Sequence, residues 1–141
     1  AFWDDDRSRM LYHGHSFTAN ATSCAASLAS LDLLLAESCT DARAMIESEH
    51  TGFAAAMRKH PMVADVRHTG TIIALEINAG TTSYHSSIRD RMYRYFLSRN
   101  VILRPLGNIV YILPPYCITK EELQYIYSCI TDFLSAEAGT Q

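Results

Sequence analysis

The sequence lacks several features that would assign a class of function directly. No apolar run is long enough to cross a bilayer, and the first residues do not resemble a signal peptide. The formal net charge of −3 gives no electrostatic reason to expect a nucleic acid or an anionic membrane as a partner. No internal repeat or domain-sized linker interrupts the 141 residues, which predict one domain able to bury a core.

Residues with metal-binding or nucleophilic chemistry are also sparse. No CxxC pair occurs, so reduced thiols in a cytosolic protein are the simplest interpretation of the cysteines. His13 and His15 are close enough to share a metal, but no other histidine or cysteine completes a known spacing, so no metal site is predicted. No Gly-rich nucleotide loop is present. The four separated cysteines are Cys24, Cys39, Cys117 and Cys129.

The hydrophobic pattern predicts an α+β fold in which helices cover a small, mostly antiparallel sheet. The first helix is apolar over most of its circumference, which predicts deep burial. Its predicted cap is Asn20, the second helix is assigned Thr40 as its cap, and Thr119 with Glu122 matches a capping box. The predicted helices cover 21–36, 41–60, 84–99 and 120–134, and the predicted strands cover 63–68, 71–77, 101–104 and 109–113.

The stretch 101–116 is predicted to be two extended apolar segments joined by a turn near Gly107-Asn108. Arg104 is the residue that does not fit this apolar stretch. Pro105 follows it and biases its backbone towards an extended conformation. A guanidinium held beside apolar strands can donate two parallel hydrogen bonds to a planar anion such as a carboxylate. An edge-strand arginine whose head reaches water is the alternative, and the residues alone leave both open.

The segment Gly14-His15-Ser16 stands just ahead of the first predicted helix. It offers backbone N–H groups and a hydroxyl to a phosphate. Glycine and serine before a helix are also ordinary loop residues, so the pattern by itself does not decide.

Taken together, residues 12–20 and 103–116 resemble the class III pyridoxal-phosphate aminotransferases. The first stretch runs into an alanine-rich helix, and the second carries Arg104-Pro105 and ends in Pro114-Pro115-Tyr116. The resemblance implies the C-terminal small domain of a fold-type I transferase, about the last third of such an enzyme. Residues 1–17 are then the loop that enters from a large domain, and residues 18–141 are the domain.

The resemblance also implies site residues. His15 and Ser16 match the positions that contact the cofactor phosphate, in the active site of the partner subunit. Gly14 matches a backbone position beside the substrate, and Arg104 matches the arginine that holds the substrate carboxylate. Tyr111 is expected to line the same pocket, with a core tyrosine as the alternative.

The second stretch is most similar to family members of biotin synthesis. This implies a cytosolic homodimer that uses pyridoxal phosphate to transfer an amino group from S-adenosylmethionine to 8-amino-7-oxononanoate. Only Lys59 and Lys120 occur, both on predicted helix surfaces, so the cofactor lysine is expected upstream and the chain is expected to be an inactive C-terminal fragment. A class III enzyme for ω-amino acids and a non-catalytic interaction module are the alternatives.

Overall fold

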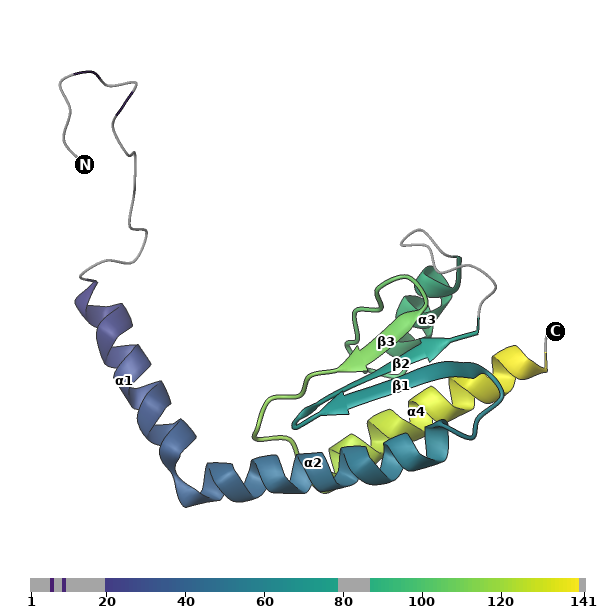
Figure 1. Cartoon of the computed structure of the whole chain (residues 1–141), viewed down its shortest axis with the longest axis horizontal. Helices are drawn as coiled ribbons and strands as arrows, with labels where there is room; N and C mark the ends of the chain where they lie inside the picture. The colour runs from purple at the N-terminus through teal and green to yellow at the C-terminus, as the bar shows by residue number, and fades with distance from the viewer. Residues whose placement is uncertain (1–5, 7–8, 10–19, 79–86, 140–141) are drawn as a thin grey trace. The chain divides into compact units, whose positions relative to one another are not determined.

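The computed structural model describes residues 6, 9, 20–78 and 87–139. It divides the chain into two compact units, residues 1–36 and residues 37–141. Figure 1 draws both. The predicted linker 1–17 lies, apart from Asp6 and Arg9, outside the described residues, and its boundary stays a prediction.

Helix α1 (Ala21–Leu35) is the described element of the first unit. The Asn20 side chain accepts a hydrogen bond from the Ser23 amide at 3.0 Å, as the capping pattern predicts. The prediction of deep burial is wrong for this chain, because α1 has no buried residue and Leu33 and Leu35 are each 72% exposed. A helix that is apolar on all sides is expected to pack against other protein surface, but the pattern does not say whether that surface belongs to the same 141 residues.

Helix α2 (Glu37–Met57) opens the second unit. The prediction of a start at Asp41 with Thr40 as the cap is wrong, because Thr40 lies inside the helix. Its hydroxyl accepts a hydrogen bond from the Arg43 guanidinium at 3.2 Å, within a helix that already begins at Glu37. Helix α2 ends shortly before Pro61, as expected because proline has no backbone N–H to donate to a helix.

Three antiparallel strands form the sheet in the order β1-β2-β3, with bounds Val63–Thr69, Ile72–Ile77 and Ile109–Ile112. The predicted antiparallel sheet is therefore confirmed. The predicted strand over residues 101–104 is wrong, because that segment pairs with β3 only through a single bridge at Leu106 and Ile109. Pro105 fixes φ near −65°, away from the value of a regular antiparallel strand, and this accounts for the interruption.

The core lies between one face of the sheet and the helices α2, α3 (Ser87–Ser98) and α4 (Lys120–Ala138). Figure 1 shows α2 and α4 running beside each other along the sheet, and they contact each other. The side chains of Phe96 and Phe133 join α3 to α4, with ring centroids 5.8 Å apart. Among the described residues, no helix has the length and apolar character needed to span a membrane.

Helix α4 begins with the predicted capping box and is tied to α2 by exposed polar contacts. The Thr119 hydroxyl accepts from the Glu122 amide at 3.2 Å, and the Glu122 carboxylate accepts from the Thr119 amide at 2.8 Å. The ammonium group of Lys120 lies 2.7 Å from the carboxylate of Glu49. Such reciprocal capping satisfies two backbone donors that the helix cannot pair internally, which fixes where α4 starts.

A fully buried histidine links α2, α4 and the turn between β1 and β2. His50 is 0% exposed, its Nε2 lies 3.1 Å from the Thr71 carbonyl oxygen, and its Nδ1 lies 2.6 Å from the Tyr127 hydroxyl. A carbonyl only accepts, so Nε2–H is the donor and the neutral ring accepts the Tyr127 hydroxyl proton at Nδ1. Burial lowers the pKa of His50 and also raises the pKa of Tyr127, which keeps both groups uncharged.

We expect acid to destabilise the chain through His50. The pKa of this histidine is lower in the folded chain than in the unfolded chain. As the pH falls below about 6.5, the unfolded state therefore binds a proton at His50 before the folded state does. The free energy of unfolding should then fall by up to about 1.4 kcal/mol per pH unit from this group. Urea titrations between pH 5 and pH 8 measure the slope, with His50→Gln as the control that lacks the titrating ring. Equal slopes for the two proteins would contradict the assignment.

Candidate functional site

The segment that carries Arg104 leaves α3 through a left-handed residue. Asn100 has φ of 58°, a conformation that asparagine tolerates better than most residues. The amide of Val101 then donates to the carbonyl of Phe96 at 2.9 Å, which closes the end of the helix. The direction in which the chain leaves α3 is therefore set by backbone hydrogen bonding.

Residues 101–106 alternate between buried and exposed side chains although they do not form a strand. Val101 and Leu103 are 7% and 8% exposed and belong to the core, whereas Ile102 is 85% exposed. Buried anchors on every second residue hold the segment against the core and turn the intervening side chains outward. Arg104 is one of the outward side chains.

The guanidinium of Arg104 makes no hydrogen bond or ion pair within the described part of the chain. Other arginines on the same unit differ, since Arg67 lies 3.6 Å from Asp65 and Arg91 pairs with Glu137 at 2.6 Å. An exposed, unpaired guanidinium on an anchored segment keeps all five donors available for a ligand. This geometry suits a carboxylate approaching from solvent or from another domain.

A two-residue turn follows Arg104 and connects its segment to β3. Leu106 and Ile109 exchange two backbone hydrogen bonds of 2.8 and 3.0 Å. Gly107 has φ of 61° at the first central position, as in the type II′ turns that close tight hairpins. The position needs glycine, because a side chain there would be strained. The predicted turn at Gly107-Asn108 is confirmed.

Asn108 fastens this turn to the end of the central strand. Its side-chain Nδ2 donates to the Ile77 carbonyl oxygen at 2.9 Å, and its own carbonyl accepts from the Ile77 amide at 2.9 Å. The residue is 4% exposed, and its Oδ1 has no hydrogen-bond partner in the part of the chain that the structure describes. A buried acceptor without a partner is unfavourable, so the bonds to Ile77 are the reason the amide stays in this position.

Tyr111 occupies the same side of the turn as Arg104. Leu106 pairs with Ile109 across the turn. Arg104 lies two residues before Leu106 and Tyr111 lies two residues after Ile109, and residues two apart in an extended chain point to the same side. Arg104 and Tyr111 are therefore brought to the same face. Tyr111 pairs with Ala74 of β2, is half-buried and stands on the sheet face opposite the core. The alternative of a core tyrosine is therefore wrong.

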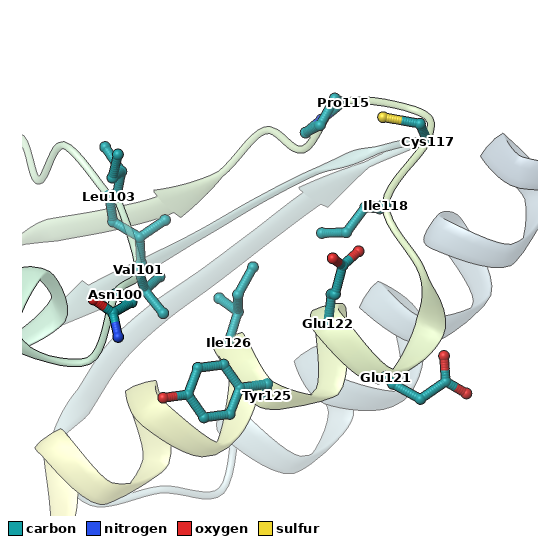
Figure 2. A pocket seen from close by; sticks show the side chains of 11 residues that line it. Asn100, Val101, Leu103, Pro115, Cys117, Ile118, Glu121, Glu122, Tyr125 and Ile126 are labelled. Atoms are coloured by element: carbon teal, nitrogen blue, oxygen red, sulfur yellow. The ribbon is translucent and has the colours of Figure 1, made fainter.

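A groove of about 710 Å³ runs on the other side of the Arg104 segment, between residues 100–103, the turn 115–118 and the first turns of α4. Figure 2 shows Leu103 and Val101 on one wall and Glu122, Tyr125 and Ile126 on α4. Its lining contains two carboxylates, Glu121 and Glu122, and no basic side chain. Because like charges repel, this groove is a poor site for a carboxylate, and Arg104 does not line it.

The described residues do not supply an attachment site for pyridoxal phosphate or for a metal. Lys120 is held by the Glu49 carboxylate, and Lys59 is an exposed residue just beyond α2, so neither lies near Arg104 in the sequence or in a buried pocket. No cluster of three or more metal-ligating side chains occurs in the part of the chain that the structure describes. The residues present do not fit the cofactor by themselves.

Three of the predicted site residues lie outside the described residues. Gly14, His15 and Ser16 stay predictions for that reason. Asn108, in contrast, was missed by sequence reasoning, which treated it only as a turn residue. A polar residue between two apolar runs was the available signal, but its burial depends on contact with Ile77, 31 positions away.

Comparison with known proteins defines the class. The family model described as "Aminotransferase class-III" matches residues 5–134, and the chain belongs to this family. The chain is 40% identical over 136 residues to the adenosylmethionine-8-amino-7-oxononanoate aminotransferase of Synechococcus elongatus, covering 94% of this chain and 31% of that protein. It is 37% identical over 122 residues to the enzyme of the same name from Nitratidesulfovibrio vulgaris, covering 82% of this chain and 22% of the relative. The chain thus spans less than a third of the length of these relatives.

Solved structures confirm the expected fold. The crystal structure of adenosylmethionine-8-amino-7-oxononanoate aminotransferase from Methanocaldococcus jannaschii has a TM-score of 0.77 and 25% identity, over 92% of this chain and 31% of that one. An omega-transferase from Vibrio fluvialis has a TM-score of 0.78 at 19% identity, over 94% of this chain and 33% of that one, which shows the fold alone. The chain therefore has the fold of one part of a transaminase.

Proposed function

We propose that this chain is the carboxylate-binding part of a pyridoxal-phosphate-dependent aminotransferase that transfers an amino group from S-adenosylmethionine to 8-amino-7-oxononanoate. The observation that carries the proposal is the exposed guanidinium of Arg104, which has no partner among the described residues and stands on a segment anchored to the core. The names of the most similar relatives support the choice of substrates. In this proposal the isolated chain is inactive.

Arg104 has one task in the reaction, which is to bind and orient. A bidentate pair between the guanidinium and the carboxylate at one end of the oxo acid fixes the direction of the chain and therefore the position of the distant keto carbon. Tyr111, on the same face of the turn, lines the path along the substrate. His15, Ser16 and Gly14 are proposed to contact the cofactor phosphate and the substrate in a site shared between two subunits.

The cofactor would supply the chemistry of amino transfer when bound. The family supports pyridoxal phosphate as that cofactor, and Lys59 and Lys120 do not provide its attachment point. This chain's own contribution is substrate positioning and, through the small-domain surface around Arg104, exclusion of water from the bound oxo acid.

We also propose a cytoplasmic homodimer. The cysteines at positions 24, 39, 117 and 129 are free, which supports a reducing compartment. Exposed leucines on α1 support a covering surface outside this chain, of which a second subunit is one part. The leucines are Leu28, Leu31, Leu33, Leu34 and Leu35.

The proposal is tested by removing the carboxylate from the substrate. In a full-length enzyme that carries this chain, the methyl ester of the oxo acid should be a poorer amino acceptor by about 10-fold to 100-fold, because it cannot form the charged bidentate pair. Product formation in single turnovers measures this, with the amino-donor half-reaction as the internal control. Equal acceptance of acid and ester would overturn the proposal.

A further inference from the structure

The position of Arg104 depends on a turn that Asn108 fastens to Ile77, next to the point where β3 starts to pair with β2. The segment ahead of Arg104 is anchored by apolar burial at Val101 and Leu103. Beyond it, the two-residue turn between Leu106 and Ile109 has no apolar side chain of its own, because Gly107 and Asn108 are its central residues. On the far side of Arg104, Pro105 is buried, and the turn beyond it is held by hydrogen bonds.

Asn108 supplies those bonds. Its Nδ2 and its backbone carbonyl both bond the peptide groups of Ile77, each at 2.9 Å, where β2 ends. The orientation of the amide is fixed by its surroundings, since the opposite orientation would place Oδ1 against the carbonyl oxygen of Ile77. Ile77 is 0% exposed and belongs to the core, so the turn is fastened to a rigid residue.

We propose that Asn108 is a positioning residue for Arg104, and through it a determinant of affinity for the carboxylate end of the oxo acid. This inference rests on the proposed function. Asn108 does not touch the substrate; it fixes the turn, the turn fixes Pro105, and Pro105 restricts the backbone of Arg104. A bidentate pair requires the guanidinium plane to match the carboxylate plane, so its strength depends on this chain of constraints.

The buried Oδ1 of Asn108, which lacks a hydrogen-bond partner among the described residues, supports a role beyond stability. A site under selection for stability alone would favour a residue with no orphaned acceptor, because such an acceptor loses its hydrogen bonds to water on burial. The donor to Ile77 is retained in spite of that cost. Asn108 thus leaves Oδ1 unsatisfied in the described part of the chain while Nδ2 keeps the turn in position. Such an unfavourable local arrangement is typical of residues that hold a functional group in place.

The test compares Asn108→Ala, Arg104→Ala and the double variant in a full-length enzyme that carries this chain. We expect Asn108→Ala to raise KM for the oxo acid about 10-fold, with kcat changed less than twofold and the amino-donor half-reaction unchanged. In the Arg104→Ala background the same substitution should change kcat/KM less than twofold, since the group that it positions is gone. If Asn108→Ala fails to fold, Asn108→Ser is the milder variant. Its KM for the oxo acid is expected to lie between the wild-type value and the value for Asn108→Ala.

Ile130→Val is the stability control. Ile130 is 0% exposed on α4 and takes no part in the turn, so this variant lowers the melting temperature without altering KM. If the Asn108 variants lower only the melting temperature, as Ile130→Val does, while Arg104→Ala still impairs the oxo-acid half-reaction, Asn108 is structural and the inference is overturned, but the proposed function stands. If Arg104→Ala itself leaves the oxo-acid half-reaction intact, the proposed function fails.

Discussion

Arg104→Ala should lower kcat/KM for the oxo acid by about 100-fold to 1000-fold in a full-length enzyme that carries this chain, and should leave the amino-donor half-reaction nearly unchanged. Truncating one partner of a close, desolvated charge pair costs about 2 to 5 kcal/mol, and 1.36 kcal/mol corresponds to a factor of ten. The two half-reactions of a ping-pong enzyme can be measured separately in single turnovers.

Two variants make the Arg104 result specific. Arg104→Lys retains the charge and loses the planar fork, so we expect it to recover only part of the lost activity. Arg58→Ala removes another exposed guanidinium that makes no hydrogen bond or ion pair within the described residues, just beyond α2, and should be silent. Equal losses in both half-reactions for Arg104→Ala would show that the substitution damages the site in general and does not remove a carboxylate anchor.

Leu75→Ala should destabilise the 141-residue chain by about 2 to 5 kcal/mol. Leu75 is 0% exposed on the central strand β2, where it pairs with Val66 of β1 and Val110 of β3. Its truncation leaves a cavity in the middle of the inner face of the sheet, against the helices. Urea unfolding followed by circular dichroism measures the change.

The control for this experiment lies on the same strand. Ile72 is 45% exposed, so Ile72→Ala removes a similar apolar volume from a site that is already partly in water and should cost less than about 1 kcal/mol. A comparable loss for the two variants would mean that the sheet buries both of its faces in solution, as it would in a self-associated chain.

Local patterns predicted the fold where they agreed with the tertiary contacts. Strands β1 and β2 and the capping box of α4 follow from alternation and from the Thr119–Glu122 spacing. The extended run 101–104 shows the same alternation of buried and exposed residues, but it is not a strand because of Pro105. The start of α2 was misplaced because Thr40 lies inside a helix that begins at Glu37, and composition does not distinguish such a threonine from a cap.

The site was predictable only in part. Arg104 stands out from its sequence neighbours. The structure leaves its side chain exposed and without a partner in residues 20–78 and 87–139, which composition could not establish. The role of Asn108 depends on a contact with Ile77 across the sheet, which no local pattern reports. The face occupied by Tyr111 follows from its pairing with β2, so excluding the core position required the register, and its place in a pocket stays a prediction.

The two-residue length of the turn between Leu106 and Ile109 restricts how this part of the chain can evolve. Side chains alternate along both arms, so deleting or inserting one residue between Arg104 and Ile109 would rotate the arginine towards the interior or move Tyr111 to the opposite face. The length of the turn is therefore restricted in addition to its residues Gly107 and Asn108. Homologous genes that retain the acid-binding arginine should therefore keep the distance from Arg104 to Tyr111 constant, and a gene with a shifted spacing should have changed its substrate.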